Sequence, residues 1–208
     1  MSSLFPERIE TERLNLVHES LAETDVFERY EPMSVQNADP DEYEHIPVEP
    51  FETPHTARAY VASRNERWDS GDSGIYVVRP KDGEDGAGEP AGEAELGAMW
   101  DRRAAYFTFG LRKRFWGRGY SGERADAFVV CAFERLDLDL VRVSHTVDNE
   151  NSKRAIRKYV DRWNGQHDAR VRNWPSPDGG DPVDLQQYSI TRENYESATV
   201  DPTVTFHD

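Results

Sequence analysis

The stretch AAYFTFGLRKRFWGRGYSGERADAFVVCAFERL, residues 104–136, decides the fold. Its first part, residues 104–111, is mostly apolar and aromatic, which is typical of a strand. From Ser121 onward, apolar side chains recur at the spacing of one helical face. The segment between them holds a basic cluster and three glycines: Arg112, Lys113, Arg114, Gly117, Arg118, Gly119 and Gly122. The sequence therefore predicts a strand, a glycine-rich turn and a helix in direct succession.

A turn of this kind is suited to binding an anion. The start of a helix leaves unpaired backbone N–H groups and a partial positive charge, and glycines let a phosphate approach the backbone closely. The alternative is a basic surface turn, which two spaced glycines alone would favour. The whole chain favours the anion, because an anionic ligand that approaches a protein of net charge −15 needs a local reversal of sign.

A second basic cluster begins the helix expected after a strand at residues 140–147. It consists of Lys153, Arg154, Arg157 and Lys158. Two successive strand-to-helix connections bring both helix starts to the same edge of a sheet when the strands are neighbours. We therefore expect a ligand with phosphates at two places to contact both clusters.

The composition bounds the class of protein. Of the 208 residues, 37% are hydrophobic and 31% are charged, with 40 acidic against 25 basic side chains. This size fits one domain, and the five Trp, nine Tyr and nine Phe argue against disorder. The negative charge disfavours nucleic acid and anionic membranes as partners, and it strains the compact state unless salt screens it. We expect a halophilic protein from a high-salt cytoplasm, in preference to an acidic protein of an ordinary cell.

Hydrophobic periodicity and turn residues outline the rest of the chain. Strands are expected at residues 11–17, 75–80, 94–100, 168–174 and 183–190, in addition to 104–111 and 140–147. Helices are expected at 20–30, 53–70, 121–136 and 151–160, and loops at 31–52, 81–91 and 175–182. No repeat or linker is visible, so we expect one domain over residues 1–195 and an exposed tail over 196–208.

Isolated reactive side chains receive structural interpretations. Cys131 lies in an apolar helical pattern and is expected in the core; as the only cysteine it excludes an intrachain disulfide or a multi-cysteine metal site, and no metal is expected. His145 alternates with Val141 and Val143, which favours a packed histidine over a site residue.

The sequence has no signal-length or membrane-spanning apolar run, so we expect a cytoplasmic protein without a membrane partner.

At the turn, the sequence resembles the GNAT superfamily of acyl-CoA-dependent N-acyltransferases, and within it the ribosomal-protein N-terminal (alanine) acetyltransferase group. Arg114 to Gly119 match the signature Q/R-x-x-G-x-G/A in full, and Trp116 to Ser121 with Glu123 match the group's W-G-R-G-Y, small residue and glutamate. The opening TERL at 11–14, N-x-x-S at 149–152 with Lys158, and YSITRE at 188–193 are also similar. The resemblance spans about residues 9–195.

The resemblance implies an α/β (α+β) fold: a mixed, mostly antiparallel GNAT-like sheet of about seven strands, splayed centrally and flanked by helices. It implies acetyl-CoA as co-substrate, with its pantetheine arm against residues 109–111 and its pyrophosphate on the N–H groups of about Phe115 to Ser121, while basic side chains tune the site. Small enzymes of this kind often form homodimers. The implied cofactor-binding residues are Phe109, Leu111, Arg112, Arg114, Phe115, Trp116, Gly117, Arg118, Gly119, Tyr120, Ser121, Asn149, Ser152 and Lys158.

The catalytic positions match less well than the cofactor turn. The group commonly has glutamate where this chain has Tyr106, and the tyrosine that many other members use as an acid falls at Ile156. The usual L-G-F after the lysine is replaced by residues 159–161, and we expect Trp163 to take the place of the aromatic residue. Ser152 is the matched catalytic candidate, to protonate or hydrogen-bond the CoA sulfur, and could equally cap its helix. Asn149 would orient the cofactor or cap the same turn.

Acyl transfer to an amine needs a neutral amine, a stabilised oxyanion and a proton for the thiolate. The backbone N–H near Leu111 would polarise the thioester carbonyl. A protein α-amine, with a pKa of about 7.7 to 8.0, needs less of a base than lysine at about 10.4. Glu93 or Glu95 could supply such a base, although a solvent-facing acid is the simpler interpretation.

We expect N-acetylation of a protein N-terminus. A small-molecule amine acceptor, such as an antibiotic or polyamine, and a non-catalytic acyl-CoA-binding module stay open as alternatives.

Overall fold

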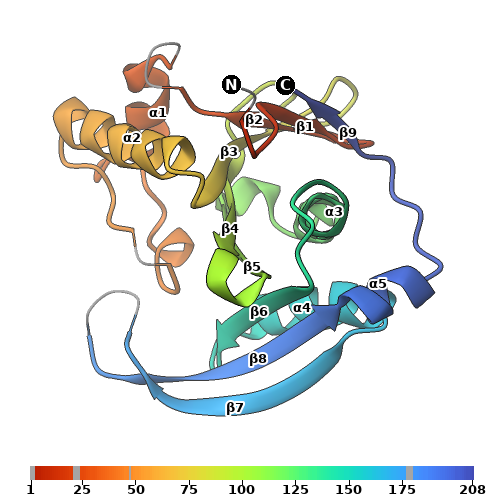
Figure 1. Cartoon of the computed structure of the whole chain (residues 1–208). Coiled ribbons are helices and arrows are strands. Elements are labelled where there is room, and N and C mark those ends of the chain that lie inside the picture. The colour runs from red at the N-terminus through yellow and green to blue at the C-terminus, as the bar shows by residue number, and fades with distance from the viewer. Residues whose placement is uncertain (1–2, 21–23, 47, 177–179) are drawn as a thin grey trace.

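A computed structural model describes residues 3–20, 24–46, 48–176 and 180–208 of the chain. Its core is a nine-stranded sheet in the order β7-β8-β6-β5-β4-β3-β2-β1-β9 (Figure 1). Neighbouring strands are antiparallel except for β5 and β6, which are parallel. The strands are β1 Arg8–Glu10, β2 Leu14–His18, β3 Ser73–Pro80, β4 Gly92–Met99, β5 Ala104–Leu111, β6 Leu140–Thr146, β7 Gln166–Trp174, β8 Val183–Thr191 and β9 Thr205–His207.

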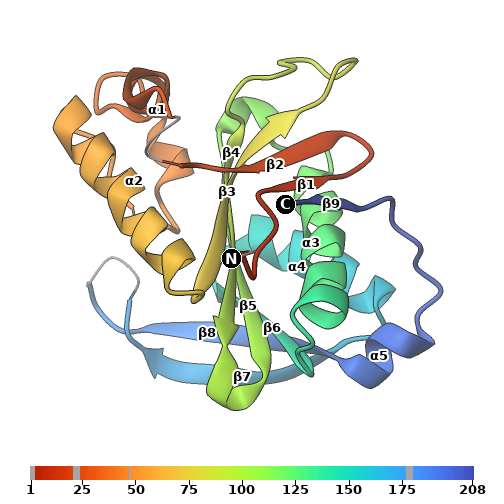
Figure 2. The same cartoon turned by 45° about the horizontal axis from the view of Figure 1, so that its top comes forward.

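Helices cover both faces of this sheet. The helices are α1 Val26–Met33, α2 Pro54–Asp69, α3 Tyr120–Val130, α4 Glu150–Arg162 and α5 Arg192–Ser197. Helices α1 and α2 lie on one face, and α3 and α4 lie on the other (Figures 1 and 2). In the described part of the chain, no helix combines the length and apolarity that a membrane span requires. The mixed, mostly antiparallel sheet between helices confirms the fold class expected from the sequence.

The feature that positions a site is the divergence of β5 from β6. The two strands pair only where residues 104–106 face residues 140–142. Beyond that point β5 continues to Leu111 along β4, and β6 continues to Thr146 along β8. The sheet therefore opens into a wedge in its centre, at the end where the glycine-rich turn and the start of α4 lie.

Helix α3 packs its apolar side chains behind this wedge. Phe128 is fully buried, with its ring centroid 5.4 Å from that of Phe107 on β5 and 5.8 Å from that of Tyr76 on β3. Burial of an aromatic side chain of this kind stabilises a domain by about 3–5 kcal/mol relative to alanine. Cys131 is fully buried at the end of the same helix, where burial raises the pKa of its thiol to about 12, so it is the core residue expected from the sequence.

The two ends of the chain depart most from the sequence-based expectations. The tail expected to be exposed ends in β9, which pairs with β1, a three-residue strand that was not expected either. Val200, Val204 and Phe206 pack partly buried against the core. The first helix begins only at Val26. Residues 21–23 of the expected helix and 177–179 of the expected turn lie outside the described residues.

Candidate functional site

A cleft of about 1400 Å³ occupies the wedge between β5 and β6. Its walls are residues 107–111 of β5, residues 143–146 of β6, the start of α3 and the exposed side of α4. Residues 41–46 of the loop between α1 and α2 close one side, where Ile46 lies over Gly110. All the cofactor-binding residues expected from the sequence line this cleft except Arg112 and Arg114.

The glycine-rich turn presents a row of backbone donors to the cleft. The N–H groups of Phe115 and Trp116 are used inside the turn, where they donate to the carbonyls of Arg112 and Lys113. Among the described residues, no acceptor lies within hydrogen-bond distance of the five N–H groups of residues 117–121. The donors left for an anion therefore begin two residues later than expected, and they continue into the N-terminus of α3.

Two glycines make this turn possible. Gly117 and Gly119 have φ angles of +77° and +84°, in the left-handed region that other residues rarely adopt. A Cβ atom on Gly117 would meet nothing within 4 Å, so the space on that side is open. The glycine spacing thus serves the backbone conformation that turns successive N–H groups toward one side.

The TERL segment between β1 and β2 holds this turn in place. One carboxylate oxygen of Glu123 accepts hydrogen bonds from the Thr11 hydroxyl, at 2.6 Å, and from the Arg13 N–H, at 2.7 Å. The other oxygen accepts from Arg13 Nε at 2.8 Å, and Arg13 Nη1 donates to the carbonyl of Arg118 at 3.0 Å. Two sequence motifs that are 110 residues apart are therefore parts of one clamp around the first turn of α3.

Three of the four basic side chains of the turn, Lys113, Arg114 and Arg118, have acidic partners. Arg114 donates to Glu89 and Arg118 donates to Asp85, at 2.7 Å and 2.8 Å, and both carboxylates belong to the loop between β3 and β4. Lys113 pairs with Asp39 and Asp41. Carboxylates of two loops thus offset most of the charge of the cluster, and the unpaired N–H groups of the turn are the donors left for an anion. The expectation that the basic side chains tune such a site stays a prediction.

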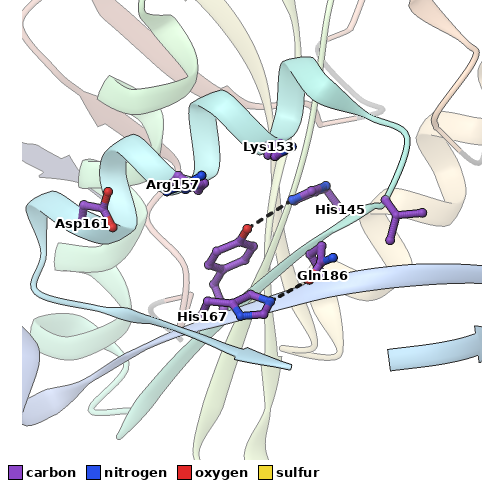
Figure 3. Close-up of a pocket in the computed structure, with 8 residues that line it drawn as sticks. His145, Lys153, Arg157, Asp161, His167 and Gln186 are labelled. Carbon is purple, nitrogen blue, oxygen red and sulfur yellow. Dashed lines mark hydrogen bonds between the residues drawn. The ribbon is translucent and has the colours of Figure 1, made fainter. Parts of the chain in front are cut away.

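The second basic cluster is divided between two sides of α4. Arg154 and Lys158 line the cleft. Lys153 and Arg157 instead line a separate cavity of about 400 Å³ between α4 and strands β6, β7 and β8 (Figure 3). Of the four cations, only Arg154 and Lys158 are therefore placed to meet a ligand in the cleft, where the sequence led us to expect the whole cluster.

The cavity of Figure 3 contains the histidine of β6. His145 is 5% exposed, its Nδ1 lies 2.7 Å from the carbonyl of Thr146, and its Nε2 lies 3.5 Å from the Tyr188 hydroxyl. Burial lowers the pKa of this imidazole. His145 is thus packed, as expected, although one edge of it also reaches the cleft.

Both Asn149 and Ser152 were candidates for capping α4, and the structure uses Asn149. The Asn149 side chain accepts a hydrogen bond from the Ser152 N–H at 2.8 Å and is the N-cap of the helix. Ser152 lines the cleft, and its side chain forms no hydrogen bond with another described residue. Ser152 is therefore not needed as a cap.

The carboxylates of β4 lie on the other face of the sheet. Glu93 pairs with Arg29 of α1 and accepts a hydrogen bond from Tyr60 at 2.6 Å. Glu95 is 8% exposed and pairs with Arg67 of α2, and it accepts from the Tyr106 hydroxyl at 2.8 Å. Neither glutamate is the solvent-facing acid expected from the sequence, and neither lines the cleft.

Sequence reasoning missed several residues of the cleft. From the loop, Asp41, Glu42, Glu44 and His45 line it, and burial raises the pKa of Glu42. Arg124 of α3 is 2% exposed and also lines the cleft. The loop residues carry no periodic signal, and an arginine within a helix is usually on the solvated face, so no pattern could have indicated either.

Comparisons with known proteins agree with this arrangement. The family profile described as acetyltransferase (GNAT) domain matches residues 15–159. Mycobacterium smegmatis RimJ, solved in complex with CoA-disulfide, is similar in structure with a TM-score of 0.69 and 15% identity, over 95% of this chain and 93% of that chain. A Vibrio cholerae protein that carries the name of a ribosomal-protein-serine acetyltransferase has a TM-score of 0.67 and 15% identity, over 90% and 99% of the chains.

A GNAT-family acetyltransferase from Bacillus anthracis has a TM-score of 0.67 and 19% identity, over 89% of this chain and 99% of that chain. At such identities the likeness concerns the fold alone. A sequence comparison with curated proteins found no match.

Proposed function

This chain belongs to the acetyltransferase (GNAT) family, whose members use acetyl-CoA, and from that premise we propose that it acetylates the N-terminal α-amine of a protein, such as a ribosomal protein. The transfer is direct, from the thioester to the amine, without a covalent enzyme intermediate. The resemblance to the ribosomal-protein N-terminal acetyltransferase group and the likeness to RimJ support this choice of acceptor.

The observation that carries the proposal is the row of unpaired N–H groups at residues 117–121, at the mouth of a cleft in the centre of the sheet. Five donors and the N-terminus of α3 fit a pyrophosphate, which needs several hydrogen bonds and positive potential at one place. Residues 109–111 would hold the pantetheine arm, and Arg154 and Lys158 at the rim would meet the remaining phosphate.

The acceptor side of the cleft favours a cationic amine. The loop between α1 and α2 contributes Asp41, Glu42 and Glu44 to the lining, and His45 lies beside them. An acidic rim of this kind attracts the basic N-terminal segments of ribosomal proteins. Because an α-amine is partly neutral near pH 7, this acceptor does not need the carboxylates of Glu93 or Glu95, which are paired with arginines on the other face.

Ser152 is the proposed catalytic residue at the start of α4. Its hydroxyl faces the cleft, and the helix is already capped by Asn149, so the hydroxyl is available to hydrogen-bond the CoA sulfur. The backbone of β5 near Leu111 would polarise the acetyl carbonyl, as an oxyanion site does.

Mass spectrometry of a peptide panel tests the acceptor. Peptides with free and with blocked N-termini, some containing lysine, are incubated with acetyl-CoA and the protein in molar potassium chloride, in keeping with the high-salt cytoplasm that we propose. We expect acetylation of free α-amines only. A cationic small amine in the same assay serves as a competing acceptor.

The outcomes separate the three functions. Acetylation of the small amine and of no peptide would overturn the protein acceptor in favour of a small-molecule acetyltransferase. Binding of acetyl-CoA without transfer to any amine would leave a non-catalytic acyl-CoA-binding module. Sedimentation in the same buffer tests the homodimer that we also propose.

A further inference from the structure

The cleft contains a buried arginine that no other described residue neutralises. Arg124 lies in the second turn of α3, is 2% exposed, and has its Nε and Nη1 atoms enclosed without a hydrogen-bond partner. The two acids of the same helix that flank it are engaged elsewhere: Glu123 accepts hydrogen bonds from Thr11 and Arg13, and Asp126 accepts from Arg162 at 2.5 Å and Trp163 at 2.8 Å, so Asp126 acts on Arg124 only through space. Within the described residues, the Arg124 guanidinium therefore has neither a carboxylate nor a carbonyl.

Three aromatic rings surround this guanidinium. Its central carbon lies 4.5 Å from the ring centroid of Phe109, 5.3 Å from that of Phe128 and 5.4 Å from that of Phe107. Ring faces attract a cation, but such contacts recover much less free energy than the burial of an unpaired charge costs. The fold gains little from a charge at this position, so the charge points to a ligand.

The position of Arg124 identifies the part of the ligand that it would meet, given the cofactor orientation proposed above. Acetyl-CoA with its pyrophosphate at residues 117–121 extends its arm along β5, from Leu111 back toward the point where β5 and β6 meet at residues 104–106. Phe109 and Phe107 lie on that path, and Arg124 contacts both. The guanidinium is thus beside the reactive, sulfur-bearing end of the arm and away from the phosphates.

The opposite wall offers this sulfur no strong proton donor, because burial raises the pKa of the Tyr159 hydroxyl to about 12 and His145 lies against the Thr146 carbonyl and the Tyr188 hydroxyl. Ile156 lines the cleft from α4, at the position where many relatives have an acidic tyrosine, and it cannot donate a proton. Ser152 can hydrogen-bond the sulfur but is a weak acid. A leaving group that is not fully protonated departs as a thiolate, and a thiolate in a closed cleft needs a nearby positive charge.

We propose that Arg124 is a catalytic residue that stabilises the CoA thiolate as it leaves. The amine nitrogen forms the new C–N bond to the acetyl carbon, the C–S bond breaks, and its electron pair goes to sulfur, beside the guanidinium. The proton that the amine loses passes to solvent, so the products are the acetylated amine, the CoA thiolate and one proton. This role rests on the proposed cofactor site but not on the identity of the acceptor.

The test measures the thiol of bound CoA without any acceptor. The protein saturated with CoA is titrated with base, and thiolate formation is followed by ultraviolet absorbance against the same protein saturated with desulfo-CoA. The single cysteine, Cys131, does not interfere, because burial raises the pKa of its thiol to about 12. We expect the pKa of the bound thiol to lie at least about one unit below that of free CoA, as for a charge next to an opposite charge.

Arg124→Met removes the cation and keeps a side chain of similar length. We expect it to return the thiol pKa toward that of free CoA and to lower kcat about tenfold, with the KM for acetyl-CoA changed much less. Arg157→Met, which removes an equal charge from the cavity on the other side of α4, is the matched control and should leave the thiol pKa unchanged.

Two results would overturn the proposal, and they differ in what else they affect. If CoA binds but its thiol pKa equals that of free CoA, or if Arg124→Met binds CoA and leaves that pKa as in the wild type, the role of Arg124 is wrong and the acetyltransferase proposal stands. If CoA does not bind the wild-type protein at all, both proposals fail together.

Discussion

The sheet buries one arginine behind each face, and the two have opposite surroundings. Arg29, on the face covered by α1 and α2, is 4% exposed and pairs with Glu93 and with Glu19, whose carboxylate lies 3.5 Å from its Nε. Arg124, on the face covered by α3 and α4, is 2% exposed and has no acidic partner among the described residues. A paired buried charge belongs to the architecture of the protein, whereas an unpaired one facing a cleft indicates a ligand.

The largest effect is expected when the paired arginine is removed. Arg29→Met would leave the buried Glu19 without its arginine, while the partly exposed Glu93 keeps Arg64 at 3.7 Å. We expect the free energy of unfolding to fall by about 3–5 kcal/mol. Chemical denaturation measures it, with Arg58→Met on the exposed side of α2 as the control of equal charge. A loss of less than about 1 kcal/mol would show that the pair contributes little and would remove the contrast between the two faces.

The clamp at the start of α3 is a paired charge next to the cleft, so it should affect both stability and binding. Glu123→Gln keeps the shape but weakens the bonds from Thr11 and Arg13. We expect a stability loss of about 2 kcal/mol, since bonds to charged groups are worth about 1.5–3 kcal/mol, and weaker binding of acetyl-CoA. Denaturation and calorimetric titration measure the two, with Glu7→Gln as the control. If stability falls while the affinity for acetyl-CoA is unchanged, the clamp stabilises the fold and does not shape the proposed cofactor-binding turn.

The conformation of the glycine-rich turn was predictable because its determinants are local. The strand at residues 104–111 was predicted with its observed bounds, and the following helix begins at Tyr120, one residue earlier than expected. Apolar periodicity and glycine spacing act over a few residues, and both can be read from the chain. The same holds for α2, whose capping box of Thr53 and Thr56, with Pro54 at the first helical position, is a short motif.

The pairing of charges was not predictable, because it depends on contacts between distant segments. Glu93 and Glu95 find their arginines in helices that begin tens of residues earlier, and Arg114 and Arg118 find theirs in the loop between β3 and β4. Strand β9 adds to the sheet next to β1 from the opposite end of the chain. Three-residue strands are also too short for periodicity to reveal.

On the face that carries the cleft, the effect of replacing Ser152 on turnover tests the proposed catalytic role. Ser152→Ala removes a hydroxyl that makes no hydrogen bond to another described residue, so stability should be nearly unchanged. We expect kcat to fall about tenfold, equivalent to about 1.4 kcal/mol, with little change in affinity for acetyl-CoA. Steady-state kinetics with the best peptide acceptor measure kcat and the KM for acetyl-CoA, and Ser70→Ala at the end of α2 is the control. Unchanged turnover would remove Ser152 from the mechanism and leave the sulfur to Arg124.

A smaller effect is expected from the buried histidine. Burial lowers the pKa of His145 below its ordinary value of about 6.5, so the unfolded chain binds the proton more readily than the folded protein. Its contribution to stability is complete above about pH 6.5 and is lost as the pH falls from there toward the folded pKa. We expect His145→Gln to reduce the loss of unfolding free energy as the pH falls below about 6.5, which denaturation at a series of pH values measures. Equal pH profiles for the two proteins would contradict this assignment.

No loss of stability is expected at the unpaired arginine. Replacing a buried charge that lacks a partner by an apolar side chain is neutral or stabilising, so Arg124→Met should keep or raise the free energy of unfolding, by up to about 2 kcal/mol. Chemical denaturation of Arg124→Met and Arg29→Met under the same conditions measures the difference between their free energies of unfolding. A loss as large as that of Arg29→Met would mean that the aromatic rings of Phe107, Phe109 and Phe128 hold the guanidinium for the sake of the fold. A gain in stability together with slower turnover would mean that the protein keeps a destabilising charge in its cleft because the chemistry there requires it.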